Sequence, residues 1–330
     1  NKHTRLSAGI LVLVLVILIA ATISFSANVS KRSGSNQNSA SDTAINANGN
    51  EIVQGDNHLY GVSDAAGNTI LEPEGKQLQF VGTDYLAAKQ ETEDGDRFGV
   101  LDLDGNVAAP FVYQDIQALT ASYYLATLAD TEQVVLYDRD FCAADAMIWD
   151  SSKWEKPLLT LTKGEDSFQY SLEKGILQLV KAEMSRKTDD FSFSVSSEKV
   201  NAALLSPEEW RLSLDQMTQF LTMVKRQDFS HLQECTDQEH ENAVLNGAVL
   251  ADSKVTKTDS VLYLQADSDD AGKAVLTWQM ALTIRDADNN TQTRTLTVKM
   301  QKSGKEIWLI TEAKLGVASA GESVYRDELL

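Results

Sequence analysis

The sequence predicts a chain of three parts: an N-terminal transmembrane helix, an all-β repeat domain of hairpin- or blade-like units, and a C-terminal α+β domain with helices packed on a curved antiparallel sheet. Three observations predict it. Residues 6–25 are uncharged and apolar, a short pattern near residue 60 recurs near residue 98, and a helical pattern after Ser206 precedes several strand-like runs. The expected boundaries are 1–26 for a signal-anchor with a short basic N-terminus, 27–50 for a disordered Ser/Asn-rich linker, 51–205 and 206–330.

The charge of the chain limits its partners. Its 330 residues carry 29 Lys and Arg against 48 Asp and Glu, a formal net charge of −19. Nucleic acid is therefore excluded as a partner, because its phosphates must be neutralised by Lys and Arg and an acidic chain repels them. Residues 51–140 hold 17 acidic and 4 basic side chains, a balance of 4 − 17 = −13. Such a stretch attracts cations or basic surfaces, although a solvated, solubilising face is the simpler interpretation.

Residues 6–25 read LSAGILVLVLVILIAATISF. Twenty residues at the helical rise span about 30 Å, the hydrocarbon thickness of a bilayer. We therefore expect an uncleaved anchor with the bilayer as its partner. A cleaved signal peptide is the alternative, because Lys2 and Arg5 form a basic start and Ser24 and Ser26 are small residues suited to cleavage. That alternative predicts a secreted protein.

The expected location is the cell membrane, single-pass, with the N-terminus cytoplasmic and the later domains extracytoplasmic. Lys2 and Arg5 before the span are matched by Lys31 and Arg32 after it, so charge gives almost no orientation. The orientation comes instead from the position of the span at the start of a long folded remainder. Residues 27–50 are rich in Ser, Asn and Ala and predict a flexible tether spanning about 25–30 Å.

An internal repeat predicts the β domain. Residues 60–68 read YGVSDAAGN and residues 98–106 read FGVLDLDGN, an offset of 98 − 60 = 38, and a proline follows each copy. Each copy predicts a hairpin whose turn uses Gly and Asn where the backbone needs a positive φ. A single hairpin cannot bury its apolar face, whereas stacked copies can. The strand-like runs at 158–162, 168–172, 176–180 and 191–195 are grouped with this domain.

This pattern resembles the WG-repeat family, whose units carry an aromatic-Gly pair, an Asp-x-x-Gly turn, a following proline and a Leu-Ala strand. Tyr85-Leu86-Ala87 and Tyr124-Leu125-Ala126 supply the last feature. The resemblance covers about residues 60–140, with a weak third copy at 134–138. It departs from the family because Tyr60 and Phe98 stand where tryptophan is usual. The resemblance implies a binding or scaffold module without catalytic residues.

The C-terminal domain begins with a capping box at Ser206-Pro207-Glu208-Glu209. A helical apolar stripe follows, and we expect its first residue, Trp210, to be buried. Short helices are expected at 228–232 and 239–245, and strands at 261–266, 274–285, 291–301 and 307–313. The order of elements over 206–315 resembles the cone-shaped fold of the nuclear transport factor 2-like superfamily. That resemblance implies a pocket between helices and sheet, in a superfamily that includes enzymes and non-catalytic modules.

Two groups of residues have spacings that suggest a metal site. His231, Cys235 and Glu239 would align as metal ligands on one continuous helix, but Thr236-Asp237 is expected to interrupt it. Asp102-Leu103-Asp104-Gly105 favours a hairpin turn over a calcium loop. We therefore predict no catalytic, cofactor-binding or metal-binding residues and no cofactor.

Other groups of the C-terminal half are expected to serve structure. His231 and His240 fall in polar stretches, and Tyr263 and Trp278 are expected to pack in the sheet. A disulfide between Cys142 and Cys235 stays open, because sequence spacing carries no geometry.

The resulting hypothesis is a membrane-tethered, extracytoplasmic, non-catalytic binding or scaffold protein. It would engage protein, peptide or cell-envelope components through the β-repeat and cone-like domains. The alternative is a hydrolase or isomerase that uses the pocket of the C-terminal domain. No G-x-S-x-G, H-E-x-x-H, P-loop or dinucleotide motif supports that alternative.

Overall fold

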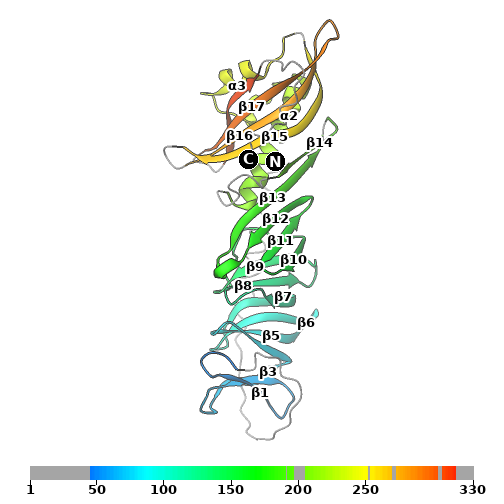
Figure 1. Ribbon diagram of the computed structural model, residues 1–330. Coiled ribbons are helices and arrows are strands. Elements are labelled where there is room, and N and C mark those ends of the chain that lie inside the picture. Colours follow the sequence, from blue (N-terminus) through cyan, green and yellow to red (C-terminus); the bar gives the residue numbers. More distant parts are fainter. Residues whose placement is uncertain are drawn as a thin grey trace. The chain divides into compact units, whose positions relative to one another are not determined.

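The computed structural model describes residues 45–190, 192–196, 205–251, 253–269, 273–303 and 307–316 (Figure 1). It gives the backbone alone at residues 193, 259–263 and 265. Of the described residues, 54% lie in strands. The chain forms two compact units that divide between Ser151 and Ser152, whereas the sequence-based boundary at 205/206 falls inside the second unit.

The predicted fold class and membrane location need correction. No helix within the described ranges is long and apolar enough to cross a membrane. The longest, α2 (Pro207–Arg226), carries charged residues in its first and last turns and one apolar stripe, so it is built to cover a sheet. Residues 6–25 lie outside the described ranges. The structure therefore gives a mostly β fold with two α-helices in its described part, in place of the expected transmembrane, single-pass architecture.

Two antiparallel sheets form the first unit. The smaller sheet has the order β1-β2-β3 and the larger the order β4-β5-β6-β7-β8-β9. The strands are β1 (Glu51–Gln54), β2 (Tyr60–Ser63), β3 (Thr69–Gly75), β4 (Gln77–Val81), β5 (Tyr85–Thr92), β6 (Gly95–Asp102), β7 (Val107–Ala118), β8 (Tyr123–Leu128) and β9 (Val134–Asp138). Because neighbours in sequence are neighbours in each sheet, every connection is a short hairpin or turn.

The repeated glycine allows a close strand crossing. A Cβ on Gly61 would lie 2.4 Å from the Leu71 carbonyl oxygen, and one on Gly99 would lie 2.7 Å from the Phe111 ring. In both copies the pairing register shifts next to the glycine, where the partner strand bulges. The aromatic-Gly-Val pattern is therefore a device for packing a bulged strand against a flat one.

The repeated aspartate closes each turn. Asp64 Oδ1 accepts bonds from the amides of Ala66 and Asn68, and Asp102 Oδ1 does the same for Asp104 and Asn106. A third turn follows β9, where Asp138 Oδ1 accepts from the amides of Asp140 and Cys142. In that turn Phe141 occupies the position of the repeat glycine, with a left-handed φ of 55°.

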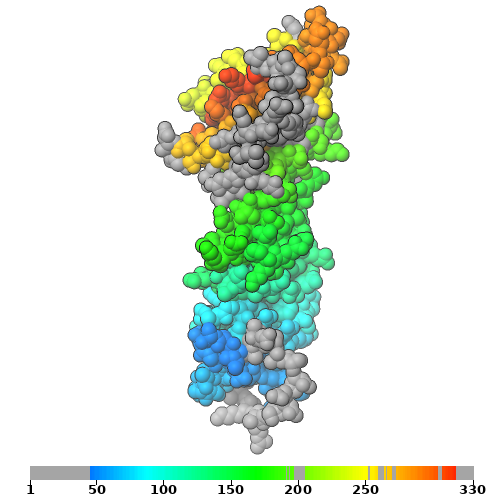
Figure 2. Space-filling model, in the orientation of Figure 1, coloured from blue at the N-terminus to red at the C-terminus, as the bar shows by residue number. Residues whose placement is uncertain are grey.

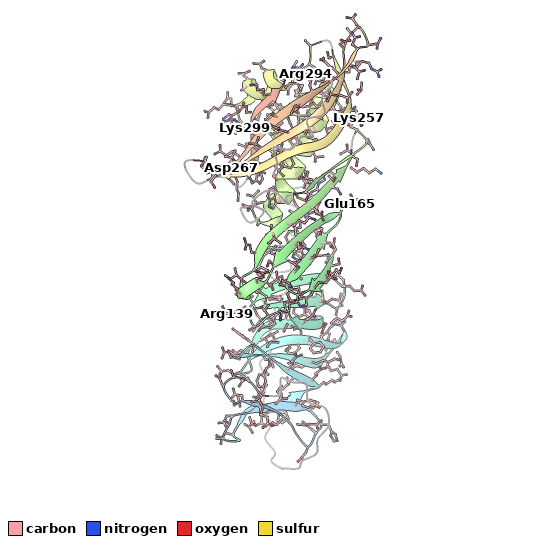
Figure 3. The ribbon with its side chains drawn as sticks, viewed as in Figure 1. Arg139, Glu165, Lys257, Asp267, Arg294 and Lys299 are labelled. Atoms are coloured by element: carbon pink, nitrogen blue, oxygen red, sulfur yellow. The ribbon has the colours of Figure 1, made fainter. Side chains whose placement is uncertain are left out.

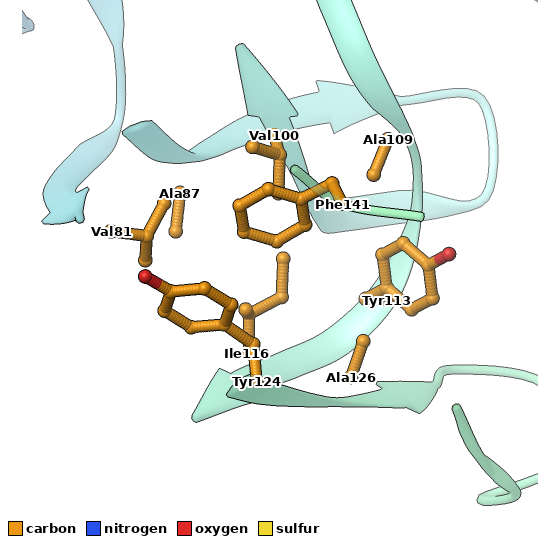
Figure 4. Packing of buried hydrophobic residues seen from close by; sticks show 9 residues of the cluster. All are labelled: Val81, Ala87, Val100, Ala109, Tyr113, Ile116, Tyr124, Ala126 and Phe141. Atoms are coloured by element: carbon orange, nitrogen blue, oxygen red, sulfur yellow. The ribbon is translucent and has the colours of Figure 1, made fainter. Parts of the chain in front are cut away.

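The central residues of β5, β6 and β8 are buried on both faces of the sheet. Leu86 on β5 and Leu101 on β6 belong to one apolar cluster. Their chain neighbours Ala87 and Val100 belong to another, on the opposite face of the sheet. Figure 4 shows the cluster that contains Ala87 and Val100, where the Phe141 ring lies among residues of the five strands β4–β8. Small side chains such as Ala87 let successive layers approach, which explains the Leu-Ala strand of the repeat. Figure 2 shows the visible face of this unit, coloured blue to cyan for its first strands.

The second unit contains two further sheets that share no hydrogen-bonded strand pair in their described parts. The first has the order β10-β11-β12-β13-β14 and the second the order β15-β16-β17-β18. The first comprises β10 (Ser151–Glu155), β11 (Leu158–Lys163), β12 (Asp166–Ser171), the 3-10 turn η1 (Glu173–Gly175), β13 (Gln178–Lys187) and β14 (Ser192–Ser196). The second consists of β15 (Lys254–Ser268), β16 (Ala274–Arg285), β17 (Thr291–Lys302) and β18 (Trp308–Leu315). The helices α2 and α3 (Glu241–Ala248) and the 3-10 turn η3 (Leu232–Glu234) precede it in the chain.

The predicted start of α2 is confirmed. Ser206 accepts from the Glu209 amide, and the Glu209 carboxylate accepts from the Ser206 amide, so the capping box is complete. Trp210 is fully buried, as predicted. At the other end Gln227 adopts the left-handed conformation, with a φ of 53°, and stops the helix.

Candidate binding surface

Acidic side chains dominate the surface of the first unit. Residues 45–151 contain 19 acidic and 4 basic residues, a balance of 4 − 19 = −15. Each of the four basic side chains is already paired with an acid of the same unit. Lys76 contacts Glu91 and Asp96 at 3.0 and 2.7 Å, and Lys89 contacts Asp96 at 3.8 Å.

The two other pairs involve arginine. Arg97 contacts Asp130 at 3.3 Å, and Arg139, labelled in Figure 3, contacts Asp140 at 3.6 Å. Because all four cations of residues 45–151 are engaged, the remaining carboxylates have no free basic side chain to pair with inside this described range.

Two hairpin tips bring six of these acids together. The β5–β6 tip supplies Glu91, Glu93, Asp94 and Asp96, and the β8–β9 tip supplies Asp130 and Glu132. The Arg97–Asp130 ion pair shows that the two tips are neighbours. We call these six residues the hairpin-tip surface. With Lys76, Lys89 and Arg97 beside them, the local balance is 3 − 6 = −3.

The backbone of the tips explains why the acids point outward. Gly95 has a φ of 99° and Glu132 a φ of 59°, so both tips turn in the left-handed region and leave their flanking side chains in solvent. Glu93, Asp94 and Glu132 are exposed and make no ion pair or side-chain hydrogen bond in the described structure. These three carboxylates form the open part of the hairpin-tip surface.

The paired part behaves differently. The hydrogen bond from Lys76 holds the pKa of Asp96 below its usual range, and the same contact raises the pKa of Lys76. Both groups therefore stay charged over the whole physiological range. Lys76 fixes the β5–β6 tip and leaves the neighbouring Glu93 and Asp94 free to meet a cation from outside.

The turn aspartates are not part of this surface. Hydrogen bonds from Asn68 lower the pKa of Asp64. The carboxylate of Asp102 accepts hydrogen bonds from the amide of Asp104 and from the amide and side chain of Asn106. The calcium-loop alternative for residues 102–105 thus has no free carboxylate on Asp102. Within the described ranges, no three His, Cys, Asp or Glu side chains are arranged to hold a metal ion.

An aromatic cluster beside the third turn was missed by sequence reasoning. Phe141 stacks on Tyr124 with ring centroids 4.8 Å apart and meets Tyr85 edge-on at 5.3 Å. The hydroxyls of Tyr113 and Tyr137 share a hydrogen bond, and burial raises the pKa of Tyr113. The cluster is a packed core (Figure 4), and its role is to close the repeat stack.

The three potential metal ligands of the second unit are not brought together. His231 is exposed and contacts Glu234 at 3.0 Å, whereas Cys235 is fully buried after the short turn η3. Burial raises the pKa of the Cys235 thiol to about 12, so it stays protonated. Cys142 is exposed, and both cysteines are free thiols in this structure.

The space between α2 and its sheet is filled by apolar side chains. Trp278, Leu276 and Met280 on β16 are fully buried. In the described part of residues 205–316, the buried polar residues are Ser213, Thr236 and Thr258. His240 is partly exposed and contacts Asp237 at 2.7 Å at the start of α3. This interior offers the hydrolase or isomerase alternative no buried carboxylate or imidazole among its described residues.

Comparisons with family models, with curated proteins and with solved structures find no match. The resemblances to WG repeats and to the cone fold therefore stay predictions from the sequence. The interpretation of function rests on the geometry of the chain itself.

Proposed function

We propose that this chain is a non-catalytic binding or scaffold protein that engages a basic protein or peptide segment through the hairpin-tip surface. One observation carries the proposal. Glu93, Asp94 and Glu132 are exposed beside a paired ion cluster, and the four basic side chains of residues 45–151 are all engaged. A partner that supplies Lys or Arg would complete the charge pattern that the unit itself leaves open.

The stacked hairpins suit this role physically. A strand buried on both faces holds its tips in fixed positions, so the carboxylates are presented without a large ordering cost on binding. Charged groups at an exposed rim mainly raise the association rate and set specificity. The expected complex is therefore fast to form and strongly dependent on salt.

The test is a titration of the full chain with a fluorescent peptide of alternating Lys and Ser, followed by anisotropy. The triple variant Glu93→Gln, Asp94→Asn, Glu132→Gln should weaken binding by about tenfold or more, at roughly 0.5 kcal/mol for each exposed pair. The matched control is Glu51→Gln, Asp84→Asn, Asp104→Asn. These three exposed acids lie at the opposite strand ends, and their substitution makes the same change in net charge.

Equal weakening by the two triple variants would mean that only the net charge matters, and the proposed surface would be wrong. Absence of salt-dependent binding by the unsubstituted chain would contradict the proposal outright. An acidic peptide of the same length serves as the negative probe.

A further inference from the structure

Helix α2 has two faces with different chemistry. Trp210, Leu214, Met217 and Leu221 form its apolar stripe and are fully buried within the domain of β15–β18. A second face carries Arg211, Asp215 and Arg226. The first two are one helical turn apart, and the third follows about three turns later on the same side.

This charged face of α2 meets three charges of opposite sign on the β10–β14 sheet and the segment after β13. Arg211 Nε lies 2.8 Å from Asp166 Oδ2, and Asp215 Oδ1 lies 2.7 Å from Arg186 Nε. Arg226 Nη2 lies 2.7 Å from Asp190 Oδ2. Along the helix the charges are positive, negative and positive, and each faces a charge of opposite sign. We call these three ion pairs the charged joint.

The two ends of the charged joint differ in burial. The Asp166 side chain is 2% exposed and is held by both Arg211 and Arg186, with a further bond from the Ser185 amide. Ser185 also donates to Glu165, labelled at the start of β12 in Figure 3. By contrast, the Arg226 side chain is 58% exposed. Added salt weakens the attraction between exposed charges more than the attraction between buried charges, because its ions reach the exposed charges directly.

We propose that the charged joint is a salt-sensitive latch between the two sheets of the second unit. The exposed Arg226–Asp190 pair opens first, and the buried Asp166 cluster acts as the pivot about which α2 and its sheet turn. The described parts of β14 and β15 contact each other without a hydrogen-bonded ladder between them.

The latch is tested by a distance measurement across the joint in the full chain. Ile176 and Val249 are exposed and lie on the two sides, so each is changed to cysteine for spin labelling. Cys142→Ser removes the exposed native thiol, and the buried Cys235 stays unlabelled. Double electron–electron resonance is then recorded from about 0.05 M to about 1 M sodium chloride, a range over which the screening length falls from above 10 Å to about 3 Å.

We expect one distance population at low salt and a second, longer one at high salt. Arg226→Asp should raise the open-to-closed ratio by up to about fivefold at low salt, and adding Asp190→Arg should restore it. Lys153→Asp breaks an exposed ion pair on β10 outside the joint and should change nothing.

An unsubstituted chain whose distances do not change with salt would overturn the latch, and this measurement needs no charge variant to fold. A control variant that shifts the distances as much as Arg226→Asp would also overturn it. Failure of the exchanged Asp190→Arg, Arg226→Asp pair to restore the closed population would contradict the assigned role of this ion pair.

Discussion

Gly247 decides how closely α3 can lie on β18. A Cβ at this position would come 1.7 Å from the Ala313 carbonyl oxygen, far inside contact distance and against backbone that cannot rotate away. Helix propensity alone favours Gly247→Ala by about 1 kcal/mol. Overpacking against a fixed neighbour costs up to about 3 kcal/mol, so we expect a net loss of about 2 kcal/mol. For a unit of this size the melting temperature should fall by about 4–8 °C.

The assay is thermal unfolding of the full chain, followed by circular dichroism. Asn246→Ala is the matched control, because Asn246 is exposed in the same helix and its substitution gains propensity without a clash. It should leave the melting temperature unchanged or raise it slightly. If Gly247→Ala proves as stable as Asn246→Ala, the close packing of α3 on β18 is wrong.

Three further outcomes follow from the structure. Trp210→Ala should cost about 3–5 kcal/mol, because the side chain is fully buried; an unchanged melting temperature would place it at the surface. Asp64 has a pKa lowered by its turn hydrogen bonds, so its stabilisation is complete above the unfolded pKa near 4 and is lost as the pH falls through the folded value. Melting temperatures between neutral pH and about pH 2 should therefore show a shallower acid decline for Asp64→Asn than for the native chain. Cys142 should react with a thiol reagent in the native chain, whereas Cys235 should react only after unfolding, which mass spectrometry of the labelled peptides would decide.

Local patterns of the sequence predicted local structure well. The turns at Asp64 and Asp102 and the cap at Ser206 use residue types whose side chains bond their own backbone, so a few neighbouring letters suffice. The third turn was less visible because Phe141 and Cys142 stand where the first two copies have Gly and Asn. Burial of the Phe141 ring stabilises the backbone of this turn, and such burial cannot be predicted from the residue types of a turn.

Long-range features could not be predicted in the same way. Asp166 reads as part of a Gly-Glu-Asp turn, yet it is buried by Arg186 and Arg211, which lie 20 and 45 residues further along the chain. The Arg211–Asp166 contact crosses the expected domain boundary at 205/206, and both sheets belong to one compact unit. Arg211 and Asp215, at i and i+4, were the one sequence feature that could have indicated a second, charged face on α2. The apolar stripe of the same helix is the stronger pattern, and it predicts only the buried face.

The membrane prediction shows a different limit. It rested on hydropathy of residues 6–25, which lie outside the described ranges, and no described helix can cross a bilayer. The candidate binding surface depended on both levels of information. The composition of residues 51–140 predicted an acidic surface. Only the ion pairs of Lys76, Lys89 and Arg97 show which carboxylates are already paired and which face solvent without a basic partner.

Carboxylate footprinting of the full chain, with and without the Lys/Ser peptide, tests the central claim most directly. A carbodiimide and an amine label exposed acids, and mass spectrometry reads each site. Bound peptide should protect Glu93, Asp94 and Glu132, while Glu51 and Asp104 stay fully reactive. Protection spread evenly over all exposed acids, or confined to the opposite strand ends, would contradict it.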